Sequence, residues 1–113
     1  MKLVDDGIAL SELKEMAERG FGTLVKAVVD VASGVMAIDA ELHADEEAFL
    51  LERGSDQHDL WGINLYPDVE GVDWLEFDSV INLRPASGNR SRGVDDRATR
   101  DRIREIVTRL VRR

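Results

Sequence analysis

The sequence has no cysteine among its 113 residues. This absence excludes disulfide bonds, thiolate metal sites and a cysteine nucleophile, and it fits a reducing compartment. The sequence also lacks an apolar run near the roughly 20 residues that a membrane-spanning helix needs. At the N-terminus, Asp5 and Asp6 stand where a signal peptide needs apolar residues. We therefore expect a cytoplasmic protein that has no membrane partner.

Aromatic residues are scarce, with two Trp, one Tyr and three Phe. Proteins that hold single-stranded nucleic acid stack the bases on aromatic side chains, and no aromatic stripe accompanies the basic part of this chain. We expect Trp61 and Trp74 to be core residues. The long acidic part of the chain argues against binding to long duplex nucleic acid, because it would repel the phosphates.

The composition that is present is that of a folded domain, with 43% hydrophobic and 34% charged residues. Disordered chains have fewer hydrophobic residues. A length of 113 residues fits one domain and is short for two. We therefore predict a single domain over residues 1–113.

Charge is distributed unevenly along the chain. Residues 1–83 contain five basic and nineteen acidic residues, whereas residues 84–113 contain ten arginines, no lysine and four acidic residues. Arginine grips a carboxylate or a phosphate at two points, which lysine cannot do. The basic segment therefore either folds back on the acidic part of the chain or meets an anionic partner.

Two regions read as helices near the middle and start of the chain. Residues 12–19 follow Ser11, an expected N-cap, and end at Gly20. Residues 44–53 begin with acidic residues and precede a glycine, which favours a helix. The apolar run Ala48–Leu51 would also suit a strand, so this second assignment has an alternative.

The C-terminal helix has the clearest pattern in the sequence. Four apolar residues recur at helical spacing: Ile103, Ile106, Val107 and Leu110. Asp95 or Asp96 is the expected N-cap of this helix of about fifteen residues. The pattern predicts an apolar stripe that packs on a sheet, with the arginines facing outward.

Four segments read as strands. Thr23–Val31 and Val35–Ala40 are apolar and flank a turn, which predicts a hairpin. Leu60–Tyr66 and Trp74–Leu83 follow, with a loop between them. In the last strand we expect Leu75, Phe77, Ser79, Ile81 and Leu83 on a core face and the alternate residues on a polar face.

These elements predict an α+β fold. Strands joined as two hairpins imply one antiparallel sheet of about four strands, with two or three helices packed on one face, the last of them amphipathic. The edges of the sheet and its polar face make a homodimer an expected assembly.

Four segments together resemble one family of small prokaryotic proteins that is catalogued only as a domain of unknown function. The segments are Glu41–Asp45, Asp59–Pro67, Ser79–Pro85 and Gly88–Arg92. The resemblance covers nearly the whole chain and supports the single-domain prediction. It implies no activity and assigns no catalytic or binding residue.

The first candidate site is the arginine-rich loop just before the C-terminal helix. Its candidate ligand-binding residues are Arg84, Asn89, Arg90, Ser91 and Arg92. Glycines in such a loop let backbone N–H groups approach a ligand, and arginine pairs with phosphate. The loop could hold a phosphate or a nucleotide. The alternative is a surface loop whose arginines pair with the acidic part of the chain.

The second candidate is a metal site at His43, Asp45 and Glu46. Imidazole and carboxylate together bind zinc or manganese. Asp30, Asp39 or Asp78 would add a further ligand if the fold brings one near. The alternative is an ordinary acidic helix start, since the complete motif of a zinc hydrolase is absent.

The third candidate is the polar face of the last strand, with Asp78, Asn82 and Arg84. Asn64 and Tyr66 would lie beside it if the two strands pair. Such a cluster could line a pocket, or it could be an internal hydrogen-bond network.

Three functions follow from these candidates. In order of preference, they are an anion-binding module, an interaction subunit without a small ligand, and a metal-dependent hydrolase. No cofactor is indicated.

Overall fold

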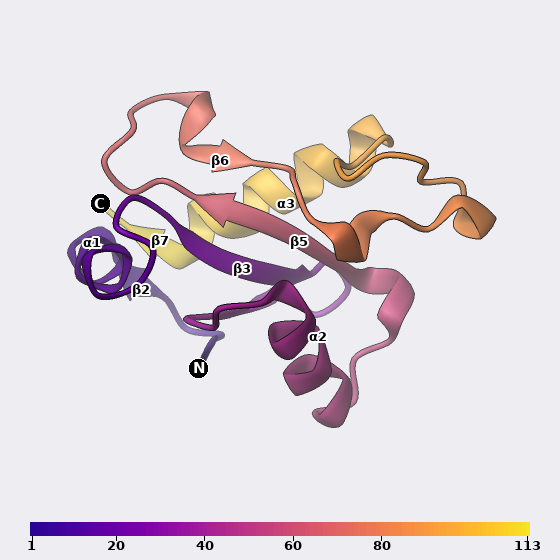
Figure 1. Ribbon diagram of the computed structural model, residues 1–113, viewed down its shortest axis with the longest axis horizontal. Helices are drawn as coiled ribbons and strands as arrows, with labels where there is room; N and C mark the ends of the chain where they lie inside the picture. Colours follow the sequence, from indigo (N-terminus) through magenta and orange to yellow (C-terminus); the bar gives the residue numbers. More distant parts are fainter.

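The computed structural model describes residues 1–113 and contains a five-stranded antiparallel sheet with the strand order β1-β4-β3-β5-β6 (Figure 1). The strands are β1 (Lys2–Val4), β3 (Val25–Asp30), β4 (Val35–Ile38), β5 (Leu60–Leu65) and β6 (Leu75–Glu76). The α+β class and the expected β3–β4 hairpin are confirmed. The extra strand is β1, which pairs with β4 at the edge of the sheet.

Three α-helices pack on the sheet: α1 (Leu10–Arg19), α2 (His43–Glu52) and α3 (Arg97–Leu110). Short 3₁₀ turns are Gln57–Asp59, Val72–Trp74, Val80–Asn82 and Pro85–Ser87. A separate pair of short parallel strands, β2 (Ile8–Ala9) and β7 (Val111–Arg112), joins the start and the end of the chain. No helix has the length and apolar character that a membrane span requires.

The helices cover both faces of the sheet, so the expectation that they share one face is wrong. In β3, Val25, Ala27 and Val29 belong to a core of 20 residues with α1 and α3, whereas Val28 packs with Leu50 of α2. Figure 1 shows α3 behind the sheet and α2 on the near side. Because β3 is apolar on both sides, each face needs a cover. We call the two sides the α1/α3 face and the α2 face.

The predictions for α2 and α3 are confirmed. Residues 43–52 are helical, and the four expected apolar positions of α3 are all buried. Asp96 is the N-cap of α3, and its carboxylate accepts a hydrogen bond from the backbone N–H of Thr99. The prediction that Ser11 caps the first helix is wrong, because α1 begins at Leu10 and has no side-chain cap.

The prediction of a long strand over Trp74–Leu83 is also wrong, since only Leu75–Glu76 pairs with β5. Beyond that pair, the side chain of Asn82 makes the hydrogen bonds to β5 that a paired strand would otherwise make. It accepts a hydrogen bond from the N–H of Gly62 and donates to the carbonyl of Gly62. The predicted core and polar faces of this strand are also wrong at its end. Asn82, predicted on the polar face, is fully buried, and Leu83, predicted on the core face, is 43% exposed.

Candidate functional site

A row of three polar side chains crosses the α2 face of the sheet. Lys26 of β3 lies directly opposite Asn64 of β5, and Asn64 lies directly opposite Glu76 of β6. Their strand neighbours Ala27, Ile63 and Leu75 belong to the core on the other face. Because side chains alternate along a strand, the three polar side chains point to the α2 face.

This row forms the floor of a cavity of about 500 Å³. One wall is the start of α2, and the facing wall is the segment around the 3₁₀ turn at residues 80–82. The walls consist of Leu42, His43, Ala44, Ser79, Val80, Ile81 and Arg92. We call this cavity the α2 pocket.

Gly62 lets the second wall approach the sheet. A Cβ atom added at Gly62 would lie 2.5 Å from Cβ of Ser79, so no other residue fits there without a shift of the segment. Glycine inside a strand commonly marks such a close approach of another segment. Gly62 therefore helps to define the width of the α2 pocket.

Asn64 lines this pocket and carries a buried acceptor without a partner. Its Nδ2 donates to Oε1 of Glu76 at 2.9 Å and to the carbonyl oxygen of Asp78 at 3.3 Å. Its Oδ1 is buried and has no hydrogen-bond partner, and the whole residue is only 7% exposed. The partners of Nδ2 lie toward β6, and Lys26 of β3 is the neighbour of Asn64 on the other side.

His43 contributes a second acceptor. Its Nε2 lies 2.8 Å from the carbonyl oxygen of Ile63. A carbonyl oxygen can only accept, so Nε2 carries the hydrogen, and in the neutral ring the lone pair is on Nδ1. Burial lowers the pKa of His43, which keeps the ring neutral at neutral pH. Nδ1 has no hydrogen bond within the protein.

The charged groups of the pocket differ in their partners. Arg92 Nε is 2.7 Å from Oδ1 of Asp78, and Glu76 accepts hydrogen bonds from Asn64 and from the hydroxyl of Tyr66. Lys26 has no carboxylate partner and only lies over the ring of Phe21, with its Nζ 5.0 Å from the centroid. Lys26 is therefore the one cation of the pocket without an ion pair.

Glu46 lies one turn along α2 from His43 and is fully buried. Its Oε2 accepts a hydrogen bond of 3.2 Å from the N–H of Ala40, while Oε1 has no partner. Burial raises the pKa of Glu46 to about 9. The carboxyl group is therefore protonated and neutral at neutral pH.

The three residues of the predicted metal site do not face one space. His43 and Glu46 point inward, whereas Asp45 is exposed and lines a separate surface hollow with Phe49. The one group of histidine and carboxylates whose ligand atoms lie close together consists of Asp56, His58 and Asp59, on a surface turn.

The predicted arginine-rich loop is built around its asparagine. Nδ2 of Asn89 donates to the carbonyl oxygens of Asn82, Ser91 and Gly93, and its Oδ1 accepts from the N–H of Asp95. The side chain of Ser91 donates to Asp95. These two candidate residues therefore stabilise the loop itself.

The three arginines of that loop point in different directions. Arg84 stacks on Trp61 at 4.3 Å and donates to the carbonyl oxygens of Gln57, Leu60 and Ile81. Arg92 pairs with Asp78 at the α2 pocket, and the side chain of Arg90 is exposed without a partner. Of the seven ligand-binding residues that the sequence predicted, the structure places Asp78 and Arg92 in the α2 pocket.

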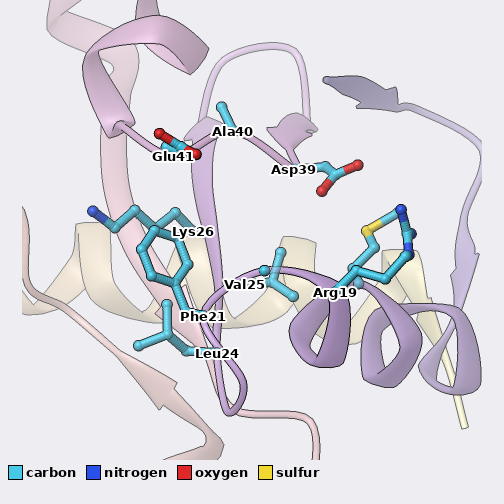
Figure 2. Close-up of a pocket in the computed structure, with 10 residues that line it drawn as sticks. Arg19, Phe21, Leu24, Val25, Lys26, Asp39, Ala40 and Glu41 are labelled. Carbon is cyan, nitrogen blue, oxygen red and sulfur yellow. The ribbon is translucent and has the colours of Figure 1, made fainter.

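A smaller cavity of about 220 Å³ adjoins the α2 pocket and shares Leu24 and Lys26 with it (Figure 2). Figure 2 shows Lys26 beside Phe21, with Asp39 above Arg19 on the other side. None of its lining residues has a buried polar atom without a partner. The unsatisfied acceptor of Asn64 therefore distinguishes the α2 pocket as the candidate site.

Sequence reasoning placed Asn64, Tyr66 and Asp78 together in the third candidate, as residues that could line a pocket, but it assigned His43 and Arg92 to the other two candidates. It also missed Lys26 and Glu76. The signal for Lys26 was present, because a lone lysine in the apolar strand segment Val25–Val29 needs a polar space beside it. The signal for Glu76 depends on strand register and cannot be read locally.

Of the comparisons with known proteins, only the one with protein families gives a match. Neither the curated proteins nor the solved structures contain a match to this chain. The model of a family described as "Protein of unknown function (DUF5674)" matches residues 2–110, which is nearly the entire sequence. The chain therefore belongs to this family, whose description assigns no function.

Proposed function

We propose that this protein binds a small anionic molecule in the α2 pocket, with the anionic group of the ligand at Lys26. The observation that carries this proposal is the lack of an ion pair at Lys26 in a chain with 23 acidic residues. An unpaired ammonium in a concave site attracts a carboxylate or a phosphate.

The other charges of the pocket support this assignment. Asp78 forms an ion pair with Arg92, Glu76 accepts hydrogen bonds from Asn64 and Tyr66, and neither acid forms an ion pair with Lys26. A volume of about 500 Å³ lies in the usual range for small-molecule sites. The proposal keeps the anionic ligand predicted from the sequence and moves it from the arginine-rich loop to the pocket beside it.

The apolar part of the lining indicates the rest of the ligand. Besides the polar side chains of Lys26, Asn64 and Glu76, the lining of the pocket includes four branched apolar side chains: Leu24, Leu42, Val80 and Ile81. Leu42 and Val80 are 55% and 62% exposed, on opposite walls. A ligand with an apolar body would cover both, which adds favourable burial to the charge pairing.

Calorimetric titration tests this proposal with inorganic phosphate and with isocaproate, a small branched carboxylate. We expect the Lys26→Met variant to lose the binding that the parent protein shows. Lys14→Met is the matched control, because Lys14 is an exposed lysine of α1 outside the pocket. Arg90→Met tests the arginine-rich loop, and a loss of binding in that variant but not in Lys26→Met would place the ligand at the loop and contradict the proposal.

The remaining sequence-based predictions stand as further proposals. They are a single domain, a cytoplasmic location and a homodimer. The interaction subunit is the alternative function, and the metal-dependent hydrolase at His43, Asp45 and Glu46 ranks below it because the three side chains do not face one space. Sedimentation of the purified protein tests the homodimer, and metal analysis of the same sample tests the hydrolase.

A further inference from the structure

We infer that the ligand of the α2 pocket carries an O–H or N–H group beside its anionic group, as α-hydroxy acids and α-amino acids do, and that Asn64 and His43 recognise it. This inference rests on the proposed function, since it assumes that an anion occupies Lys26. It goes further by assigning the chemical class of the ligand and the residues that select it.

The first step concerns the acceptor of Asn64. Oδ1 is buried without a partner, and its orientation is fixed because Nδ2 already donates to Glu76 and to the carbonyl of Asp78. Both of those partners only accept, so the amide cannot be turned around. A buried carbonyl oxygen normally has a donor. A ligand group that donates would complete this site.

The second step concerns His43. Its Nε2–H is held by the carbonyl oxygen of Ile63, the residue before Asn64. The ring therefore lies close to the backbone that carries Asn64, and its Nδ1 is an acceptor without a partner on a residue that lines the same pocket. Two acceptors without partners make a site that favours a hydroxyl or an amino group over a methylene group.

The third step places the donor relative to the anion. Lys26 and Asn64 are direct cross-strand neighbours, so their Cβ atoms are about 5 Å apart. The flexible side chain of Lys26 can therefore reach a ligand group adjacent to the one that donates to Asn64. Substitution on the carbon next to a carboxylate meets this requirement.

α-Hydroxy acids and α-amino acids both meet these requirements, but they differ in the group that donates the hydrogen bond. The hydroxyl of an α-hydroxy acid needs only the two acceptors. The ammonium of an α-amino acid would also gain from Glu76, whose Oε1 lies 2.9 Å from Nδ2 of Asn64. The experiment below therefore includes one ligand of each type.

Three probes of one shape test the inference by calorimetric titration: isocaproate, its α-hydroxy derivative leucic acid, and its α-amino derivative leucine. We expect leucic acid, leucine or both to bind the parent protein at least about tenfold more tightly than isocaproate. The methylene group of isocaproate cannot donate a hydrogen bond to Oδ1 of Asn64 or to Nδ1 of His43. A tighter leucine assigns the ammonium as the donor, and a tighter leucic acid assigns the hydroxyl.

Variants then identify the residues responsible. His43→Phe keeps a ring of similar size but has no acceptor at the Nδ1 position, and Asn64→Ala lacks Oδ1. We expect each variant to bind the three probes with more equal affinity, and Lys26→Met to lose all three. Equal affinity of the three probes for the parent protein would overturn this inference and leave the proposed function intact. Absence of binding by isocaproate, leucic acid, leucine and phosphate would overturn both.

Discussion

The two faces of the sheet differ in what they bury. On the α1/α3 face, 20 residues form one apolar core, including Ile103 and Ile106 of α3. On the α2 face, the apolar cluster has only four buried residues, and buried polar groups such as Glu46, Asn64 and Asn82 lie beside it. Polar groups are costly to bury and are retained where they have a role. We conclude that the first face stabilises the fold and the second carries the candidate site.

The largest expected effect is a core substitution on the α1/α3 face. Ile103 is fully buried in the 20-residue core, so Ile103→Ala should lower the free energy of unfolding by about 2–5 kcal/mol. Urea denaturation measures this change. Leu51→Ala, at an exposed position of α2, is the matched control and should cost much less. Equal costs for the two variants would contradict the placement of Ile103 in the core of the α1/α3 face.

The next effect depends on pH and arises from Glu46. In the folded protein its pKa is about 9, against an ordinary value of 4.5. Between these values the unfolded chain has released the proton that the folded protein still holds, so stability falls as pH rises. This single group contributes up to about 1.4 kcal/mol per pH unit.

Glu46→Gln should remove that dependence, because glutamine keeps the shape and the neutral state of the protonated group. We expect the variant to be more stable than the parent at about pH 8 and nearly equal to it close to pH 4.5, the ordinary pKa of Glu46. Glu18→Gln, which removes an exposed carboxylate of α1 far from Glu46 in the sequence, is the control and should retain the fall in stability with rising pH. If Glu46→Gln changed stability equally at both pH values, Glu46 would not be neutral in the folded state.

A smaller effect is expected at the second wall of the pocket. Asn82→Ala would leave the N–H and the carbonyl of Gly62 without their side-chain partners, at a cost of about 1–3 kcal/mol. We also expect faster hydrogen exchange at the Gly62 N–H. Val80→Ala, in the same turn but exposed, provides the control. Unchanged exchange at Gly62 would contradict the role assigned to Asn82.

The smallest effect on stability is expected for the exposed ion pair at the rim. Arg92 and Asp78 have side chains that are 53% and 42% exposed, and such pairs add little to stability. We expect Arg92→Met to leave the urea midpoint unchanged but to weaken ligand binding, less than Lys26→Met does. A clear loss of stability in Arg92→Met would show that the rim belongs to the structural part of the molecule.

The sequence predicted those elements whose pattern is local. The stripe of α3 and the alternation of Val25, Ala27 and Val29 in β3 both appear within one segment. The α2 face was harder to predict because α2 presents His43, Glu46 and Leu50 inward, a stripe that is polar at one end. That mixed stripe does not produce the apolar period from which a buried helix face is recognised.

The rest depends on contacts between distant segments. The predicted strand around Asn82 does not form because the Asn82 side chain hydrogen-bonds to the backbone of Gly62, 20 residues away. The polar row requires the register of three strands, which places Lys26, Asn64 and Glu76 side by side. The arginine-rich loop was assigned as a site because its composition suits anions, but Arg84 and Asn89 bind backbone carbonyl groups instead.

Chemical-shift mapping by NMR of the parent protein with leucic acid is the most direct test that the α2 face carries the site. We predict the largest changes at the amides of Lys26 and Asn64 and at the ring of His43, with few changes on the α1/α3 face. Changes confined to the exposed loop around Arg90, or no change up to millimolar ligand, would contradict a ligand site built on this polar row.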